Sequence, residues 1–453
     1  MTLVLDRHVQ VLAGGRVLLG GDPGRLVRLR ADGGRALRSL LAGQSTPQLD
    51  RLGRTLLEGG LAHPRPGRSD STDVTVVVPV RDRAVELDRC LTALGRGAPV
   101  LVVDDASLDH DAVRAVATRH GARLLRQDGN TGPGGARNAG VAATTSAFVA
   151  FVDSDCVVPP GWLAGLLGHF ENPTVAAVAP RVRSRPGRTL LARYALARGP
   201  LDLGSHEARV RPGARVAYVP TAALVVRRSA LGDRAFDPGL RFGEDVDLVW
   251  RLHDAGWTVR YDPRTVVEHS EPQQWGAWLR RRHHYGTSAG PLALRHGERL
   301  TPLVLAPWPI AAWLLLAARR PAWALIVMGV PTVRLHRRLR RSGLSGSEAA
   351  PAAMTTMARG MTSTASGLGG AGLVATIPLL MAALCVRRTR STALVLLATP
   401  PLLELRQRRP AIDPVRWIGL RLVDDLAYAS GVWLSCLTLR TTAPLRPRRS
   451  RPR

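Results

Sequence analysis

Short apolar runs and amphipathic segments alternate through the middle of the chain. Residues 84–95 and 109–119 have the apolar spacing of helices, and a third helix opens at Gly132. The runs typical of strands are V-T-V-V-V-P from Val74, V-L-V-V from Val100, A-R-L-L-R from Ala122 and S-A-F-V-A-F-V from Ser146. Strands that alternate with helices through short turns predict a parallel sheet with helices on both faces. The sequence therefore predicts an α/β domain over residues 74–298.

Proline and acidic residues follow the predicted strands. Pro79 ends the first strand, Asp104 and Asp105 follow the second, and Asp153 and Asp155 follow the run from Ser146. Ligands of parallel sheets bind beyond the carboxyl ends of the strands, so we expect these five residues at one edge. Two carboxylates one residue apart repel each other unless a positive group lies between them, such as a divalent metal bound to a phosphate. The alternative is a turn in which the acids only cap helices.

Three further segments carry candidate chemistry. The run G-P-G-G from Gly132 either makes a tight turn or presents backbone N–H groups to a phosphate. Glu244 and Asp245 open a predicted helix, where the helix dipole favours carboxylates, and one of them could instead take a proton from an acceptor hydroxyl. The strand-like run from Trp257 ends in His269, and a lone histidine is more often structural than a ligand.

In this order, the motifs resemble those of family 2 glycosyltransferases with the GT-A fold, a Rossmann-like fold of transferases that use nucleotide-diphospho-sugars. The resemblance covers about half of the chain. It rests on V-V-V-P-V-R-D-R from Val76, V-V-D-D-A-S from Val102, G-P-G-G-A-R-N-A-G from Gly132, F-V-D-S-D from Phe151 and G-E-D-V-D-L-V-W-R from Gly243.

The resemblance implies a role for each matching residue. Asp104 and Asp105 would contact the uracil and ribose of a UDP-sugar, and Asp153 would face the ribose. Asp155 would hold Mg²⁺ or Mn²⁺ between the two phosphates. His269 would be an extra metal ligand or a contact of the diphosphate. The rest of the nucleotide-sugar site would comprise Pro79, Gly132, Arg137, Asn138 and Glu244.

Asp245 would be the general base. One base opposite the leaving group supports a single displacement, which inverts the anomeric centre, unlike the paired carboxylates of hydrolases. Processive family members carry Q-x-x-R-W after the base, whereas this chain has Q-Q-W-G-A-W-L-R-R-R-H-H-Y-G from Gln273, which argues against long-chain processivity. Arg281 and Arg282 in that segment could line the diphosphate or the acceptor.

Residues 1–66 predict a small separate domain, followed by a linker over residues 67–73. Two short strands flank a G-D-P-G turn, and helical segments follow from Ala36 and Pro47. This piece is either a structural cap or resembles a winged-helix-like PqqD domain, in which an edge strand captures a precursor peptide. A PqqD-like start, a family 2 transferase and an apolar C-terminal third together resemble mycofactocin-system glycosyltransferases.

That resemblance implies transfer of β-linked glucose units to the peptide-derived redox cofactor mycofactocin or its precursor. The match extends through R-R-R-H-H-Y-G-T-S-A-G-P-L-A from Arg280. A lipid-linked or cell-envelope glycan is the alternative acceptor, and a non-catalytic scaffold that binds peptide and membrane is an alternative of another class.

Residues 299–440 predict a helical region associated with the membrane. Residues 366–386 carry no charge, and roughly 20 apolar residues suffice to span a bilayer, so we expect a membrane-spanning helix there; buried or interfacial helices are the alternative. Arginine clusters at 334–341, 387–390 and in the basic tail 441–453 fit cytosolic loops or anionic lipid. The first residues lack a signal peptide, so we expect the catalytic domain on the cytoplasmic face of the cell membrane.

The amino-acid composition argues against several kinds of partner and site. The net charge is +28, and all 63 basic residues are arginine, which points to a compositional bias. No nucleic-acid-binding motif is present and phenylalanine, tryptophan and tyrosine are few, so we do not expect a nucleic-acid partner. The 4 cysteines lie far apart without C-x-x-C, which argues against a disulfide scaffold or a zinc site.

Overall fold

The computed structural model describes residues 2–22, 24–69, 71–233, 235–300, 304–305, 307–369, 371–446 and 448–449. The chain forms two compact units. The first unit comprises Met1–Val9, Gly20–Arg25 and Ala36–Gln273. The second unit comprises Gln10–Leu19, Leu26–Arg35 and Gln274–Arg453.

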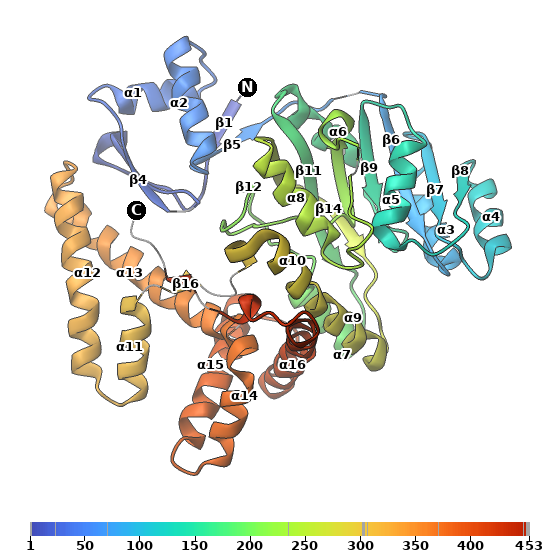
Figure 1. The fold of residues 1–453 in the computed structure, drawn as a ribbon. Helices are drawn as coiled ribbons and strands as arrows, with labels where there is room; N and C mark the ends of the chain where they lie inside the picture. Colours follow the sequence, from blue (N-terminus) through green and yellow to red (C-terminus); the bar gives the residue numbers. More distant parts are fainter. Residues whose placement is uncertain are drawn as a thin grey trace. The chain divides into compact units, whose positions relative to one another are not determined.

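Within the described residues, the central sheet of the first unit has 9 strands in the order β10-β14-β11-β13-β9-β6-β7-β8, with β12 beside β14 (Figure 1). β6 is parallel to both β7 and β9, and β7 is parallel to β8. β13 is antiparallel to both of its neighbours, β9 and β11. The strands are β6 Val74–Val80, β7 Val100–Asp104, β8 Arg123–Arg126, β9 Phe148–Val152, β10 Cys156–Val157, β11 Val175–Ser184, β12 Ala208–Val210, β13 Ala223–Arg227 and β14 Thr258–His269.

Helices alternate with the parallel strands, as predicted. α3 and α4 follow β6 and β7, and α5 precedes β9. The apolar core is built from strand residues such as Val78 and Val102 and helix residues such as Leu87, all fully buried. The helices of this unit after the N-terminal segment are α3 Ala84–Leu94, α4 His110–Arg119, α5 Gly132–Ala142, α6 Trp162–Leu167, α7 Leu190–Arg198 and α8 Glu244–Asp254, with 3-10 turns η2 Gly168–Glu171 and η3 Arg228–Ala230. The predicted α/β fold is confirmed, but the sheet is mixed and not purely parallel, because β13 runs antiparallel to its neighbours. Residues 274–298 of the predicted domain belong to the second unit.

The N-terminal segment contains the predicted short strands and both helices, and it contributes to both units. In the first unit, β1 (Thr2–Leu5) pairs antiparallel with β5 (Ala62–Arg65). A second sheet joins β2, β3 and β4. The remaining elements are β2 Gln10–Leu12, η1 Ala13–Gly15, β3 Val17–Gly20, β4 Arg25–Arg28, α1 Gly33–Leu41 and α2 Pro47–Glu58. The likeness of this segment to PqqD stays a prediction.

The second unit is mainly helical. Its elements after β4 are α9 Trp275–Thr287, α10 Ala289–His296, η4 Gly297–Leu300, α11 Pro307–Ala317, α12 Pro321–Arg341, α13 Gly346–Gly369, α14 Ala371–Cys385, α15 Arg390–Arg408, α16 Pro414–Thr438 and η5 Ala443–Leu445, with a short parallel pair of β15 Val304–Leu305 and β16 Arg448–Arg449. In this unit Val17 of β3 packs against Leu339 of α12 and Ala352 of α13.

Two glycines allow α9 and α16 to pack closely against each other. A Cβ atom added at Gly286 would lie 2.1 Å from the backbone oxygen of Tyr428, and one added at Gly431 would lie 2.0 Å from that of His283. The helices therefore cross backbone to backbone, where any side chain would force them apart.

The prediction of a membrane-spanning helix over residues 366–386 is not supported. α13 ends at Gly369 and α14 begins at Ala371, and Gly370 lies outside the described residues. None of the helices that the structure describes is both long and apolar enough to cross a bilayer. The stretch G-L-G-G-A-G from Gly367 is uncharged, but glycine and alanine contribute little apolar surface.

Candidate active site

The register of the parallel strands brings the predicted acids to one edge of the sheet. Val80 of β6 lies opposite Asp104 of β7, and Val77 lies opposite Phe151 of β9. Pro79, the pair Asp104 and Asp105, and the D-S-D segment that follows β9 therefore all lie at the carboxyl ends of neighbouring strands. This is the edge at which ligands of such sheets bind.

Asp104 is fully buried and its carboxylate is bound within the protein. Oδ1 accepts a hydrogen bond of 2.9 Å from the N–H of Ser107, and Oδ2 lies 2.7 Å from both His110 Nδ1 and Arg126 Nη1. Burial alone would raise the pKa of Asp104, but the hydrogen bonds from Ser107 and His110 and the charge of Arg126 hold it below its usual value. Asp104 thus fixes the loop that leads into α4.

Asp105 and Asn138 also bind the protein backbone. Asp105 accepts hydrogen bonds from the N–H groups of Thr131, at 2.7 Å, and Gly132, at 2.9 Å, so it secures the start of α5. Gly132 has a φ of 77°, a left-handed conformation that favours glycine. The amide of Asn138 pairs with both the N–H and the carbonyl of Phe236, at 2.9 and 2.7 Å. These hydrogen bonds fix the backbone segments next to the carboxyl ends of the strands.

Arg137 connects the end of β9 to the start of α8. Its Nη2 donates a hydrogen bond of 2.6 Å to Asp153 Oδ1, and its Nη1 donates one of 2.9 Å to Glu244 Oε1. The Arg137 side chain is only 3% exposed, whereas that of Asp153 is 29% exposed. A buried guanidinium needs such partners, because removing an ion from water costs several kcal/mol. Arg137 therefore fixes two acidic segments that are far apart in sequence.

Asp245 lies in the first turn of α8 and is partly exposed. Gly243 precedes this helix with a φ of 81°, which allows the chain to turn sharply into it. Removal from water raises the pKa of Asp245 to about 7, and the neighbouring carboxylate of Glu244 adds to the increase. Burial likewise raises the pKa of Glu244, although Arg137 opposes that shift. A carboxylate with a pKa near neutrality suits a general base.

Asp155 and His269 come together through the pairing of β10 with β14, in which Cys156 lies opposite His269. His269 Nε2 lies 3.4 Å from Asp155 Oδ1, and its Nδ1 lies 3.2 Å from Glu271 Oε1; all three side chains are buried. Burial alone would lower the pKa of His269, but Asp155 and Glu271 outweigh it and raise the pKa to about 10. Nη1 of Arg83 lies 2.5 Å from Asp155 Oδ2.

These side chains offer the ligand types that a divalent cation needs. Carboxylate oxygens suit Mg²⁺ and Mn²⁺, and the imidazole of His269 suits Mn²⁺. Over the described ranges, no three or more His, Cys, Asp or Glu side chains have the arrangement of a preformed metal centre. A cation at Asp155 would take the place of the Arg83 guanidinium, whose side chain is exposed enough to move away.

The sequence interpretation missed several residues around this edge. Arg83 follows Pro79 within the R-D-R segment, and Glu271 follows His269 by two positions; both were visible as charged neighbours of predicted site residues. His110 and Arg126, the partners of Asp104, gave no comparable signal because each also fits an ordinary surface position.

Arg281 and Arg282 belong to α9 in the second unit. Arg282 forms an ion pair with Asp424, and its guanidinium carbon lies 5.9 and 5.7 Å from the ring centres of Tyr285 and Tyr428. The predicted contact of these arginines with the donor or acceptor stays a prediction.

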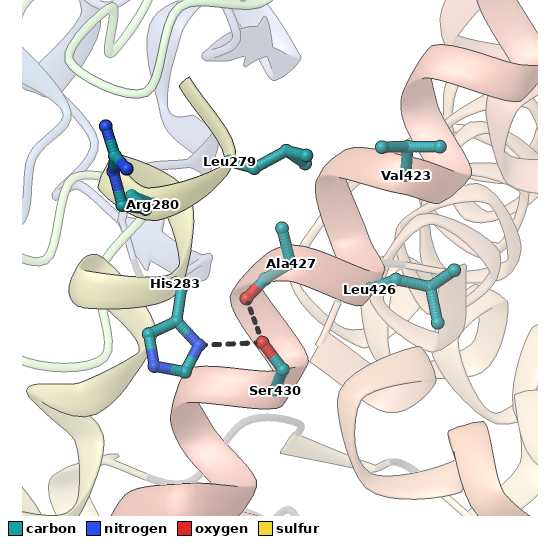
Figure 2. A pocket seen from close by; sticks show the side chains of 7 residues that line it. All are labelled: Leu279, Arg280, His283, Val423, Leu426, Ala427 and Ser430. Atoms are coloured by element: carbon teal, nitrogen blue, oxygen red, sulfur yellow. Dashed lines mark hydrogen bonds between the residues drawn. The ribbon is translucent and has the colours of Figure 1, made fainter. Parts of the chain in front are cut away.

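The second unit also contains a groove between α9 and α16, with a volume of about 370 Å³ (Figure 2). His283 Nδ1 lies 2.8 Å from the Ser430 hydroxyl, which donates a hydrogen bond to the carbonyl of Ala427. The lining residues are Leu279, Arg280, His283, Val423, Leu426, Ala427 and Ser430. None of them is a predicted site residue.

Comparison with known proteins identifies the family. Residues 75–233 match the family described as Glycosyl transferase family 2. The chain is 39% identical to the Pre-mycofactocin glycosyltransferase of Mycobacterium tuberculosis (strain H37Rv), over 98% of this chain and 96% of that protein. It is 30% identical to the Succinoglycan biosynthesis protein ExoU of Rhizobium meliloti (strain 1021), over 40% of this chain and 56% of that protein.

Among solved structures, the mannosyltransferase PcManGT of Pyrobaculum calidifontis, in complex with GDP-Man and Mn²⁺, has a TM-score of 0.47 and 20% identity. That alignment covers 88% of this chain and 98% of the other. The family match, the near-full-length relative and the strand–helix order agree with one another. The chain belongs to the mycofactocin-system branch of the family 2 glycosyltransferases, and its catalytic domain has the GT-A α/β fold.

Proposed function

We propose that the protein transfers glucose units, with β-linkage, from UDP-glucose to pre-mycofactocin, a peptide-derived precursor of a redox cofactor. The proposed acceptor rests on the 39% identity, over 98% of this chain, to a protein named for glycosylation of that compound. Identity across nearly the whole chain includes the regions outside the catalytic domain.

Asp245 is the base in this proposal. Its pKa of about 7 allows it to take the proton of an acceptor hydroxyl near neutral pH and to release it afterwards. Arg137 holds Glu244, the residue before the base, through a hydrogen bond of 2.9 Å, so the start of α8 is fixed relative to Asp153. One base acting on the face opposite the leaving UDP gives inversion.

The donor lies at the sheet edge in this proposal. The partly exposed carboxylate of Asp153 is accessible to a ribose hydroxyl, and Asp155 and His269 would hold Mg²⁺ or Mn²⁺. When bound, the cation would neutralise the negative charge that builds up on the departing diphosphate. Arg83, which pairs with Asp155, would be displaced by the cation and could then offer a second positive charge to the same phosphates.

The test is a transfer assay with the purified full chain, UDP-glucose, Mn²⁺ and pre-mycofactocin, read by mass spectrometry. We expect products that increase by whole hexose units, and no product from Asp245→Asn although this variant still binds UDP. Parallel extracts from a host with and without the gene identify the natural acceptor. An unchanged cofactor pool together with altered envelope glycans would contradict the proposed acceptor and favour a glycan or lipid acceptor.

A further inference from the structure

Two helical hairpins of the second unit expose large apolar side chains. α11 and α12 form the first hairpin, and α14 and α15 form the second. More than half of each of the following side chains is exposed to solvent: Leu314, Trp323 and Leu325 on the first hairpin, and Met381, Leu394 and Val395 on the second. Several large apolar side chains exposed on the same two hairpins point to a site of interaction.

Arginines occupy the turn of each hairpin. Arg319 and Arg320 join α11 to α12, and Arg387 and Arg388 lie between α14 and α15; all four are exposed. The sequence from residue 307 to 341 contains no acidic residue. The apolar side chains lie a few positions from these arginines along the helices. Each hairpin therefore combines a positive tip with apolar flanks, which complements an anionic, amphipathic partner.

The hairpins pack on a common support. α13 contacts α11, α12, α14 and α15 within this unit. In Figure 1 both turns point toward the lower side of the helical unit, drawn in yellow-orange and orange-red. The two arginine turns can thus act on one extended surface.

The length and apolar content of the helices together determine how deep such an interaction can go. α11 has 11 residues and α14 has 15, so at 1.5 Å per residue they extend about 16 and 22 Å, less than the roughly 30 Å hydrocarbon core of a bilayer. α12 and α15 are longer, with 21 and 19 residues, but none of the described helices is both long and apolar enough to cross a bilayer. The hairpins therefore fit the boundary between headgroups and acyl chains, where amphipathic segments bind through apolar burial and attraction to anionic lipid.

We propose that the two arginine-tipped hairpins bind the surface of an anionic lipid bilayer. The apolar side chains enter the boundary region and the arginines contact lipid phosphates. This places the enzyme at the membrane as a peripheral protein, and it does not depend on which acceptor the enzyme uses.

The test is co-sedimentation of the full chain with vesicles of phosphatidylcholine alone or mixed with phosphatidylglycerol. We expect binding to the mixed vesicles that weakens as salt is added, and much weaker binding to the neutral ones. Each arginine near an anionic surface contributes about fivefold in affinity, so Arg387→Gln with Arg388→Gln should weaken binding roughly thirtyfold. Trp323→Ser with Leu325→Ser should weaken binding to the mixed vesicles and remove the residual binding to the neutral ones.

A matched variant separates this site from general charge attraction. Arg51 and Arg54 are exposed on α2, and changing both to Gln removes the same charge elsewhere. Binding that is unaffected by this control supports the proposal, and an equal loss in the control overturns it. Failure of the wild-type chain to bind mixed vesicles also overturns it, as does light scattering that shows a dimer dissociated by Leu325→Ser without any vesicle binding. Circular dichroism and melting curves confirm that each variant is folded.

Discussion

The acidity of Asp245 gives a prediction for the dependence of the rate on pH. The group must be ionised to accept a proton, and its pKa is about 7 because the carboxyl is partly withdrawn from water and lies beside Glu244. About a tenth of the enzyme is then ionised at pH 6 and about a hundredth at pH 5. We expect kcat/KM to fall about tenfold per pH unit below neutrality, since this parameter reports groups of the free enzyme.

A substitution at Glu244 should shift the acidic part of this pH profile. Glu244→Gln removes a neighbouring negative charge but leaves Arg137, so the pKa of Asp245 falls and the decrease in rate shifts to lower pH. Asp254→Asn is the matched control, because it makes the same kind of change at the exposed far end of α8. Its profile should coincide with that of the wild type.

The assay is the initial rate of UDP release at low acceptor concentration from pH 5 to 9. The metal concentration must be saturating at each pH, so that protonation of His269 does not enter the profile. A rate that stays constant from pH 5 to 8 would refute the assignment of Asp245 as a base with a raised pKa. An unshifted profile for Glu244→Gln would refute the electrostatic cause.

Four further substitutions test other parts of the structure. Asp155→Ala should abolish turnover and the metal-dependent part of UDP binding in calorimetry; an unchanged binding curve would remove Asp155 from the metal site. Gly431→Ala should lower the free energy of unfolding by about 1–3 kcal/mol, because the added methyl meets the His283 carbonyl. Gly419→Ala, with open space on the same helix, should raise it by up to about 1 kcal/mol, and equal melting temperatures would contradict this reasoning. Asp262→Asn should cost about 3–5 kcal/mol at pH 7, because it breaks a buried pair with His169. The stability that comes from the lowered pKa of Asp262 is fully present above the ordinary value of 3.8 and is lost as the pH falls below that value towards the lowered pKa, so the cost should shrink in acid. Urea titrations that show the same difference at pH 7 and in acid would contradict this reasoning.

The strands β6 to β9 and the helices α3 to α5 could be predicted from sequence because their signals are local. The apolar run from Val74 to Val80 has the composition of a buried strand whatever surrounds it, and the acids after β7 and β9 reach one edge through the parallel arrangement alone. The order of the strands and the antiparallel course of β13 do not follow from this pattern, because they depend on pairings between distant parts of the chain.

The partners of those acids could not be predicted, because they depend on distant positions. Arg137 meets Glu244 across 107 residues, and His269 faces Asp155 only through the register of β10 and β14. Nothing near Asp104 in the sequence shows that its carboxylate is occupied by Arg126. The error over residues 366–386 had another cause, since a lack of charge was treated as evidence of apolar surface.

The packing of β3 against α12 and α13 has a consequence for synthesis. The N–H of Ala13 donates a hydrogen bond to Glu348, 335 positions later, and Val17 is buried by residues of the same late segment. At about 5–20 residues per second, a ribosome needs roughly 15–70 s to make the chain between them. Throughout that interval the early strands are without their apolar cover. The contacts between the early strands and the late helices therefore close a very long loop, and closing it should make the last stage of folding slow. Until then, the exposed apolar residues of the N-terminal segment are a binding site for chaperones.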